Sequence, residues 1–133
     1  MLEIRDITKS YEGKPLLEGI SFSVREGEIV CLLGESGSGK STLLRVIAGL
    51  EEAESGTLWW DGEEISRMLA HKRGFGLMFQ DYALFPHRSV QENVGFGLRM
   101  LGLPRAEVRA RSRSALAMVR MEGFADRAVT ELS

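Results

Sequence analysis

The feature that most constrains the fold is a glycine-rich loop between an apolar run and a segment of helical periodicity. The loop, residues 34–41, reads Gly-Glu-Ser-Gly-Ser-Gly-Lys-Ser and fits the pattern G-x-x-x-x-G-K-[ST] at every fixed position. The run Ile29–Leu33 before it predicts a strand buried on both faces of a parallel sheet. Apolar residues recur at helical spacing from Lys40 to Leu50, which predicts an amphipathic helix. This order of strand, loop and helix is the setting in which such a loop binds phosphate.

The loop also indicates how a triphosphate would be held. Its glycines allow a tight turn with N–H groups pointing inward, and the helix N-terminus adds positive potential. The predicted phosphate-binding residues are Gly34, Glu35, Ser36, Gly37, Ser38, Gly39, Lys40, Ser41 and Thr42. Among them, we expect Lys40 to reach the β- and γ-phosphates as a catalytic residue, and the Ser41 hydroxyl to bind Mg²⁺.

Strand and helix patterns follow one another along the rest of the chain. Residues 1–33 predict strands and turns, residues 56–61 a strand that leads to an Asp-Gly turn, and residues 75–79 another strand. From Val90 onward the spacing of apolar residues is helical, and Pro104 is suited to open a helix.

Composition narrows the classes of partner and site. The net charge of −2 argues against a surface built for nucleic acid, so nucleic acid is not an expected partner. The one cysteine, Cys31, excludes an internal disulfide and a multi-cysteine metal site, and its place in the apolar run predicts a small core residue. The longest apolar run falls far short of the about 20 residues that a membrane-spanning helix needs.

Three segments together resemble a known family. They are the loop "GESGSGKST", the later stretch "FQDYALFPHRSVQENVGFGL" and the end "ADRAVTELS". They are similar to the ATP-binding subunit of ABC transporters, in particular of importers for ferric iron, polyamines, sugars or sulfate, and the resemblance covers the whole chain. It implies an α/β P-loop NTPase (RecA-like) core with an antiparallel β subdomain and the start of an α-helical subdomain. Residues 1–85 would be the N-terminal part of the core, and residues 86–133 the helical subdomain.

The resemblance assigns three further residues to the nucleotide. Tyr11 matches the aromatic residue that stacks on adenine, and the alternative is that it packs within its strand. Gln80 matches the catalytic glutamine that senses the γ-phosphate and binds Mg²⁺, and the alternative is an ordinary surface glutamine. Ser133 matches the serine of the LSGGQ signature, which closes over the γ-phosphate bound to a second copy of the subunit.

The resemblance also implies a membrane partner. Tyr82 to His87 match the segment that docks against a permease, and apolar Phe85 and Pro86 suit such a surface. The alternative is that both residues pack back onto their own helix. We therefore expect the full protein to be cytoplasmic and peripheral on the inner face of the cell membrane.

Some parts of the family's machinery lie beyond the signature. They are an acidic strand whose Asp holds Mg²⁺ through water and whose Glu polarises the attacking water, and a switch histidine. The sequence stops at Ser133, inside the signature, so we expect a truncated and incomplete domain whose parallel sheet lacks strands. For these 133 residues we expect weak ATP binding at best and negligible hydrolysis.

The full protein is expected to bind ATP and Mg²⁺, to pair with a second copy and to drive transport through the permease. Two alternatives stay open at this point. One is an ABC ATPase without a transport role, and the other is a non-catalytic binding module that uses nucleotide to recruit a partner. The sequence does not identify the transported solute.

Overall fold

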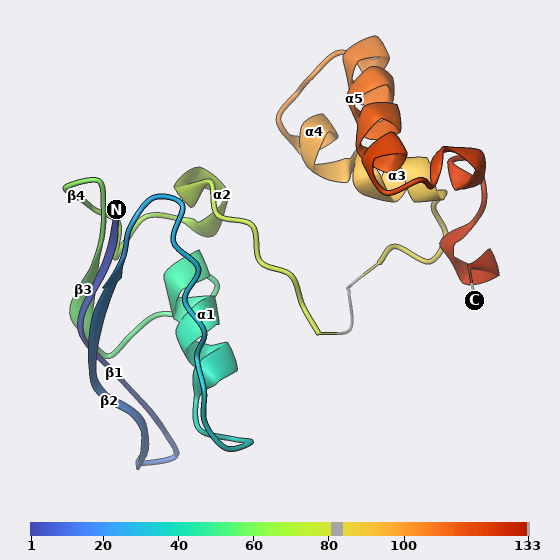
Figure 1. Ribbon diagram of the computed structural model, residues 1–133. Helices are drawn as coiled ribbons and strands as arrows, with labels where there is room; N and C mark the ends of the chain where they lie inside the picture. The colour runs from blue at the N-terminus through green and yellow to red at the C-terminus, as the bar shows by residue number, and fades with distance from the viewer. Residues whose placement is uncertain (81–83, 133) are drawn as a thin grey trace. The chain divides into compact units, whose positions relative to one another are not determined.

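A computed structural model describes residues 1–80 and 84–132 of the chain. The chain consists of two compact units, and the boundary between them in the sequence follows Met78 (Figure 1). The first unit runs from Met1 to Met78, and the second begins at Phe79. Each unit has a hydrophobic cluster of its own. The boundary that the sequence places after residue 85 stays a prediction.

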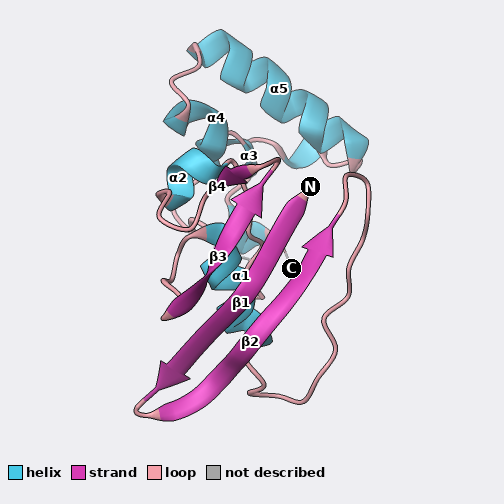
Figure 2. Cartoon of the chain, turned by 90° about the vertical axis from the view of Figure 1, so that its left-hand side faces the viewer, coloured by secondary structure: helices cyan, strands magenta, loops and turns pink. Residues whose placement is uncertain are grey.

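The first unit is a single sheet with α1 packed on one face (Figure 2). Its elements are β1 (Leu2–Tyr11), β2 (Lys14–Val24), α1 (Lys40–Ala48), β3 (Ser55–Trp60), β4 (Glu63–Glu64) and α2 (Ala70–Arg73). The strand order is β2-β1-β3-β4, and every neighbouring pair is antiparallel. The buried core residues are Ile4, Ile7, Leu17, Leu43, Val46, Leu58 and Ile65. This arrangement matches the antiparallel subdomain that the family resemblance implies.

Strands β1 and β2 form a hairpin through a two-residue turn at Glu12 and Gly13. Both turn residues have positive φ, 50° and 74°, which is the geometry whose twist matches the flanking strands. A bulge at Asp6, where φ is 52° and the register shifts, lies between Ile4 and Ile7. Because a bulge inserts one extra residue, these two isoleucines reach the same buried face despite their odd spacing.

Helix α1 is bounded at each end by a glycine with left-handed backbone. Gly39 precedes it with φ 85°, and Gly49 ends it with φ 76° while its N–H bonds the carbonyl of Val46 at 3.1 Å. A Cβ atom on residue 39 would stand 2.8 Å from Cδ2 of Leu17, so this glycine also lets β2 approach the start of the helix.

Two predicted strands are absent from the structure, and the predicted burial of Cys31 is wrong. Residues 29–33 and 75–79 have no strand pairing, and Cys31 is exposed. Ile29 is 96% exposed and Leu33 88%. The reason is that an inner strand of a parallel sheet needs hydrogen-bonding neighbours, and among the described residues no strand lies beside either run.

The second unit is helical. It contains α3 (Val90–Val94), α4 (Phe96–Met100), α5 (Arg105–Met118) and the short 3₁₀-helices η1 (Glu122–Phe124) and η2 (Val129–Glu131). Helix α5 begins directly after Pro104, as the sequence predicts. Val90, Leu116 and Ala125 form the buried cluster of this unit. No helix in either described stretch is long and apolar enough to cross a bilayer.

Candidate nucleotide site

The loop of residues 34–41 closes around the side chain of Lys40. The ammonium nitrogen (Nζ) donates hydrogen bonds to the carbonyl oxygens of Gly34 at 2.9 Å and Glu35 at 2.5 Å. It also lies 3.2 Å from the hydroxyl oxygen of Ser38. A Cβ atom on residue 34 would stand 2.8 Å from that hydroxyl, so any other residue here would force the Ser38 side chain to shift. The loop therefore places a positive charge at its centre, where a phosphate group would meet it.

The N-terminus of α1 offers unbonded N–H groups beside this charge. The first bond of the helix runs from the N–H of Leu43 to the carbonyl of Gly39 at 2.8 Å, so the N–H groups before Leu43 have no partner inside the helix. In the described part of the chain no side chain caps this end, and the first turn holds no acidic residue. These donors and the positive end of the helix dipole suit an anion.

Protein ligands for a divalent cation are sparse near the loop. Ser41 presents an exposed hydroxyl in the first turn of α1, while Thr42 beside it is buried. Throughout residues 1–80 and 84–132, no group of three or more His, Cys, Asp or Glu side chains could hold a metal ion. Mg²⁺ keeps several waters and is commonly bound through substrate phosphates and one or two protein oxygens. The site therefore fits an Mg²⁺ ion that arrives with a nucleotide.

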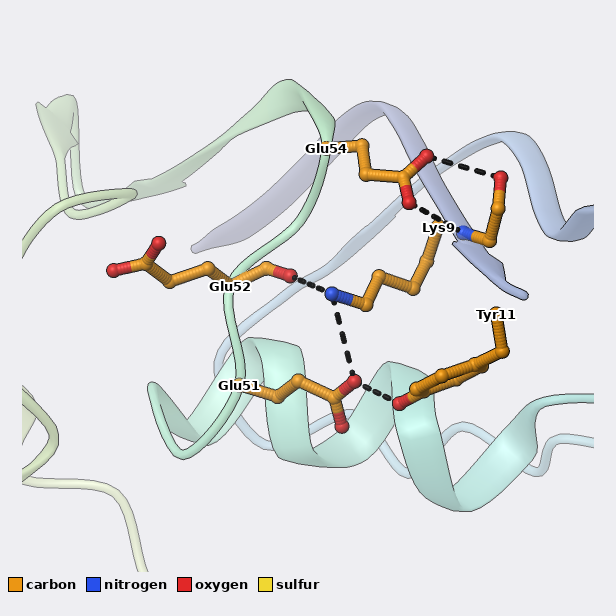
Figure 3. A network of polar contacts seen from close by, with 6 residues as sticks. Lys9, Tyr11, Glu51, Glu52 and Glu54 are labelled. Atoms are coloured by element: carbon orange, nitrogen blue, oxygen red, sulfur yellow. Dashed lines mark hydrogen bonds and ion pairs between the residues drawn. The ribbon is translucent and has the colours of Figure 1, made fainter. Parts of the chain in front are cut away.

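Tyr11 lies at the end of β1, in the same unit as the loop. Its side chain is 46% exposed, which argues against the alternative that it is buried within the strand. Its hydroxyl donates a hydrogen bond to the carboxylate of Glu51 (Figure 3). That bond is the main cause that raises the pKa of Tyr11 above its ordinary value of 10.0.

The roles of the other predicted site residues are not tested by the geometry of the loop. Gln80 is exposed and belongs to the second unit, so its role at the γ-phosphate stays a prediction. Tyr82 and Ser133 lie outside the described residues, and their roles stay predictions as well.

The segment that follows Tyr82 packs partly on its own unit. The rings of Phe85 and Phe96 lie 4.5 Å apart, and the Arg88 guanidinium lies over both, 5.2 and 5.6 Å from their centroids. Phe85 nevertheless stays 39% exposed, and Leu84 55%. Phe85 therefore packs on α4 of its own unit, and the docking of this segment against a permease stays a prediction.

Comparison with known proteins decides the family. The family described as ABC transporter matches residues 17–133. This chain belongs to the ABC transporter family. Family membership implies nucleotide binding, and it agrees with the lysine-centred loop described above.

The ABC transporter relatives are ATP-binding proteins of importers. The chain is 47% identical over 132 residues to an Escherichia coli K12 protein named Fe(3+) ions import ATP-binding protein FbpC, covering 99% of the chain and 38% of the relative. It is 47% identical over 133 residues to the spermidine/putrescine import ATP-binding protein PotA of Aggregatibacter actinomycetemcomitans, covering 100% and 36%. The chain thus spans little more than a third of the length of these relatives.

A solved ABC structure shares the fold. It is the dimeric structure of a post-hydrolysis state of the ATP-binding cassette MJ0796 bound to ADP and Pi. The TM-score is 0.88 at 29% sequence identity, and the match covers 100% of this chain and 63% of that chain. The comparison supports the P-loop NTPase class and an incomplete domain.

Two residues of this ABC transporter chain have contacts that sequence reasoning missed. Glu51 bonds Tyr11, and Asn93 bonds the backbone of Phe85. Glu51 belongs to no motif used above, and Asn93 lies in the family stretch 79–98 but had no contact assigned to it. The bond between Tyr11 and Glu51 joins residues 40 positions apart, so no local pattern marks it.

Proposed function

We propose that the whole protein is the ATP-binding subunit of an importer, which couples MgATP binding and hydrolysis to solute transport through a membrane permease. The observation that carries this proposal is the loop that encloses the Lys40 ammonium at an uncapped helix N-terminus. The two relatives named for Fe(3+) and for spermidine/putrescine import support the transport role.

The phosphates would be held by the loop and by α1. Lys40 exchanges its bonds to the carbonyls of Gly34 and Glu35 for bonds to the β- and γ-phosphates, and the first-turn N–H groups of α1 bind the remaining phosphate oxygens. Thr42 would bind the α-phosphate, and the Ser41 hydroxyl would hold Mg²⁺. When bound, the ion would neutralise negative charge on the transferred phosphoryl group.

Three residues would complete the site in the whole protein. Tyr11 stacks on the adenine base, which suits its half-exposed ring. Gln80 senses the γ-phosphate and the metal. Ser133 closes over the nucleotide bound to a second copy of the subunit, so two copies would dimerise with ATP at their interface.

The permease would bind the segment from Tyr82 to His87. The exposed apolar surface of Leu84 and Phe85 supports this assignment. The subunit would then lie on the inner face of the cell membrane, bound through the permease.

Nucleotide titration tests the first half of the proposal. Lys40→Ala in the full-length protein is expected to weaken MgATP binding by about 10- to 100-fold, because charge-assisted hydrogen bonds are lost. Lys72→Ala is the control, because Lys72 is an exposed lysine of the same unit and should leave the affinity unchanged. Equal affinity in the wild type and in Lys40→Ala would overturn the proposal.

Co-purification tests the transport half. The full-length protein isolated from membranes is expected to carry an integral membrane permease, and a Phe85→Ala variant should retain less of it. A protein that binds MgATP and emerges without any permease would instead favour an ABC ATPase without a transport role.

A further inference from the structure

The ring of Tyr11 is held at its hydroxyl end. Packing does not fix it, because the side chain is 46% exposed. The hydroxyl donates a hydrogen bond to Glu51, which lies just after the C-terminal end of α1 (Figure 3). A half-exposed tyrosine can change between staggered rotamers unless its far end is held.

Glu51 is itself held in place by Lys9. The Lys9 ammonium lies 3.7 Å from the same carboxylate oxygen of Glu51 that accepts the Tyr11 bond. It also donates to the backbone carbonyl of Glu52 at 2.9 Å. Both side chains of the Lys9–Glu51 pair are only 18% exposed, so solvent screens the pair less than an ordinary surface pair. The carboxylate is therefore a fixed acceptor for the Tyr11 hydroxyl.

Neighbouring contacts fasten the same segment to β1. The Glu54 carboxylate accepts bonds from the backbone N–H and the hydroxyl of Ser10, each at 3.0 Å. The Glu54 N–H donates to the carbonyl of Thr8 at 2.9 Å. The segment after α1 thus cannot shift along β1 without breaking several bonds, and the position of Glu51 relative to Tyr11 is set by both strand and segment.

We propose that Glu51 is a positioning residue that holds the Tyr11 ring in the orientation in which it stacks on the adenine base. The inference rests on the proposed function, because it assumes that the base contacts Tyr11. Glu51 acts through the tyrosine hydroxyl and does not itself touch the nucleotide. A ring held in advance loses less conformational freedom when the base binds, so affinity for the base rises without any added contact.

The test compares two ligands that differ in the base. Dissociation constants for MgATP and for Mg²⁺-bound inorganic tripolyphosphate are measured on the full-length protein. Glu51→Ala is expected to weaken MgATP binding about fivefold, because part of the stacking on the base is lost, and to leave tripolyphosphate binding unchanged. Tyr11→Phe, which keeps the ring and removes the hydroxyl, should show the same selective loss, and the double variant should lose no more than either single one.

Two further variants distinguish a positioning role of Glu51 from a general loss of structure around it. Glu52→Gln is the matched control, because it removes the same charge one residue away and keeps the backbone carbonyl that Lys9 uses. It should bind both ligands like the wild type. Glu51→Gln keeps an oxygen that can accept the Tyr11 bond, so it should weaken MgATP binding by about twofold or less.

The outcomes distinguish this inference from the proposed function. Equal loss of both ligands in Glu51→Ala, or additive losses in the double variant, would overturn the positioning role while the nucleotide site stands. The positioning role is likewise overturned if Glu51→Ala binds both ligands as tightly as Glu52→Gln does. A wild-type protein that binds neither ligand overturns the proposed function, and the inference falls with it.

Discussion

Asn93 binds the backbone of Phe85 at both of its polar groups. Its side-chain oxygen accepts the Phe85 N–H at 2.8 Å, and its amide nitrogen donates to the Phe85 carbonyl at 3.1 Å. The same nitrogen donates to the carbonyl of Ser89 at 3.0 Å. One side chain of α3 therefore fastens both ends of the segment 85–89, because its amide supplies a donor and an acceptor on separate atoms.

Asn93→Ala is expected to release that segment. Loss of these bonds should lower the free energy of unfolding of the second unit by about 1–3 kcal/mol and speed amide exchange in residues 85–89 by about tenfold or more. Asn93→Asp keeps only the acceptor, so its exchange rate and its unfolding free energy should lie between those of the wild type and of Asn93→Ala. Hydrogen–deuterium exchange measures the effect. Gln91→Ala is the control, because its single side-chain bond is long at 3.5 Å, and unchanged exchange in Asn93→Ala would contradict the prediction.

Gly39→Ala is expected to destabilise the first unit more than Gly37→Ala. Both glycines have left-handed backbone, with φ of 85° and 83°. A Cβ on residue 39 would meet Leu17 and the backbone oxygen of Leu16 at 2.8 and 3.2 Å, whereas one on residue 37 meets nothing within 4 Å. Strain alone predicts about 1 kcal/mol for Gly37→Ala, and the added clash predicts about 3 kcal/mol for Gly39→Ala. Urea unfolding measures both, and equal losses would show that β2 yields to the methyl group.

Arg73 joins the end of α1 to the segment before α2. Its guanidinium donates to the carbonyls of Val46 and Ile47 at 3.0 and 2.8 Å, and to those of Met68 and Ser66 at 2.7 and 2.9 Å. Arg73→Met is expected to lower the free energy of unfolding by about 2–4 kcal/mol, because partly buried carbonyls lose their donor. Arg73→Lys should recover less than half of the free energy of unfolding that Arg73→Met loses, since one ammonium cannot reach all of these oxygens.

Unfolding of the first unit can be followed directly. Trp59 and Trp60 both lie in β3, so their fluorescence in a urea titration reports on this unit. Lys72→Met is the control, because Lys72 is an exposed neighbour in the same helix. A midpoint in Arg73→Met that equals the midpoint in Lys72→Met would remove Arg73 from the structural role given to it.

Glu92 makes the start of α3 sensitive to acid. A hydrogen bond from the backbone N–H of Ser89, 2.8 Å long, is the main cause that lowers the pKa of Glu92 below 4.5. A lowered folded-state pKa stabilises the fold above the unfolded-state pKa, and this stability is lost as the pH falls through the folded-state value. The wild type should therefore exceed Glu92→Gln in Tm at neutral pH, and the two should converge as the pH falls through the lowered folded-state pKa of Glu92. A gap that persists in acid would contradict the prediction.

The sequence predicted the elements that depend on residues close to one another in the chain. The hairpin of β1 and β2 and the start of α1 depend on turn residues and periodicity within a short stretch, and both are present in the structure. The phosphate loop likewise follows from adjacent residues. Its closure around Lys40 needs only the carbonyls of Gly34 and Glu35 and the hydroxyl of Ser38.

The predictions that failed, and the contact that was missed, depend on residues far apart in the sequence. The run Ile29–Leu33 has the composition of an inner strand, but a strand also needs neighbours, and the described residues supply none. Cys31 is exposed for the same reason. The bond between Tyr11 and Glu51 depends on how the end of β1 meets the end of α1, which no single stretch of sequence encodes.

The unpaired backbone groups of Ile29–Leu33 also affect the tendency of this polypeptide to aggregate at high protein concentration. A short apolar run with β-branched residues, no proline and unpaired backbone groups is a template for intermolecular β-pairing. Glu28 and Glu35 flank the run and oppose such pairing by charge repulsion between copies. Salt screens that repulsion, so precipitation should set in at lower protein concentration as ionic strength rises.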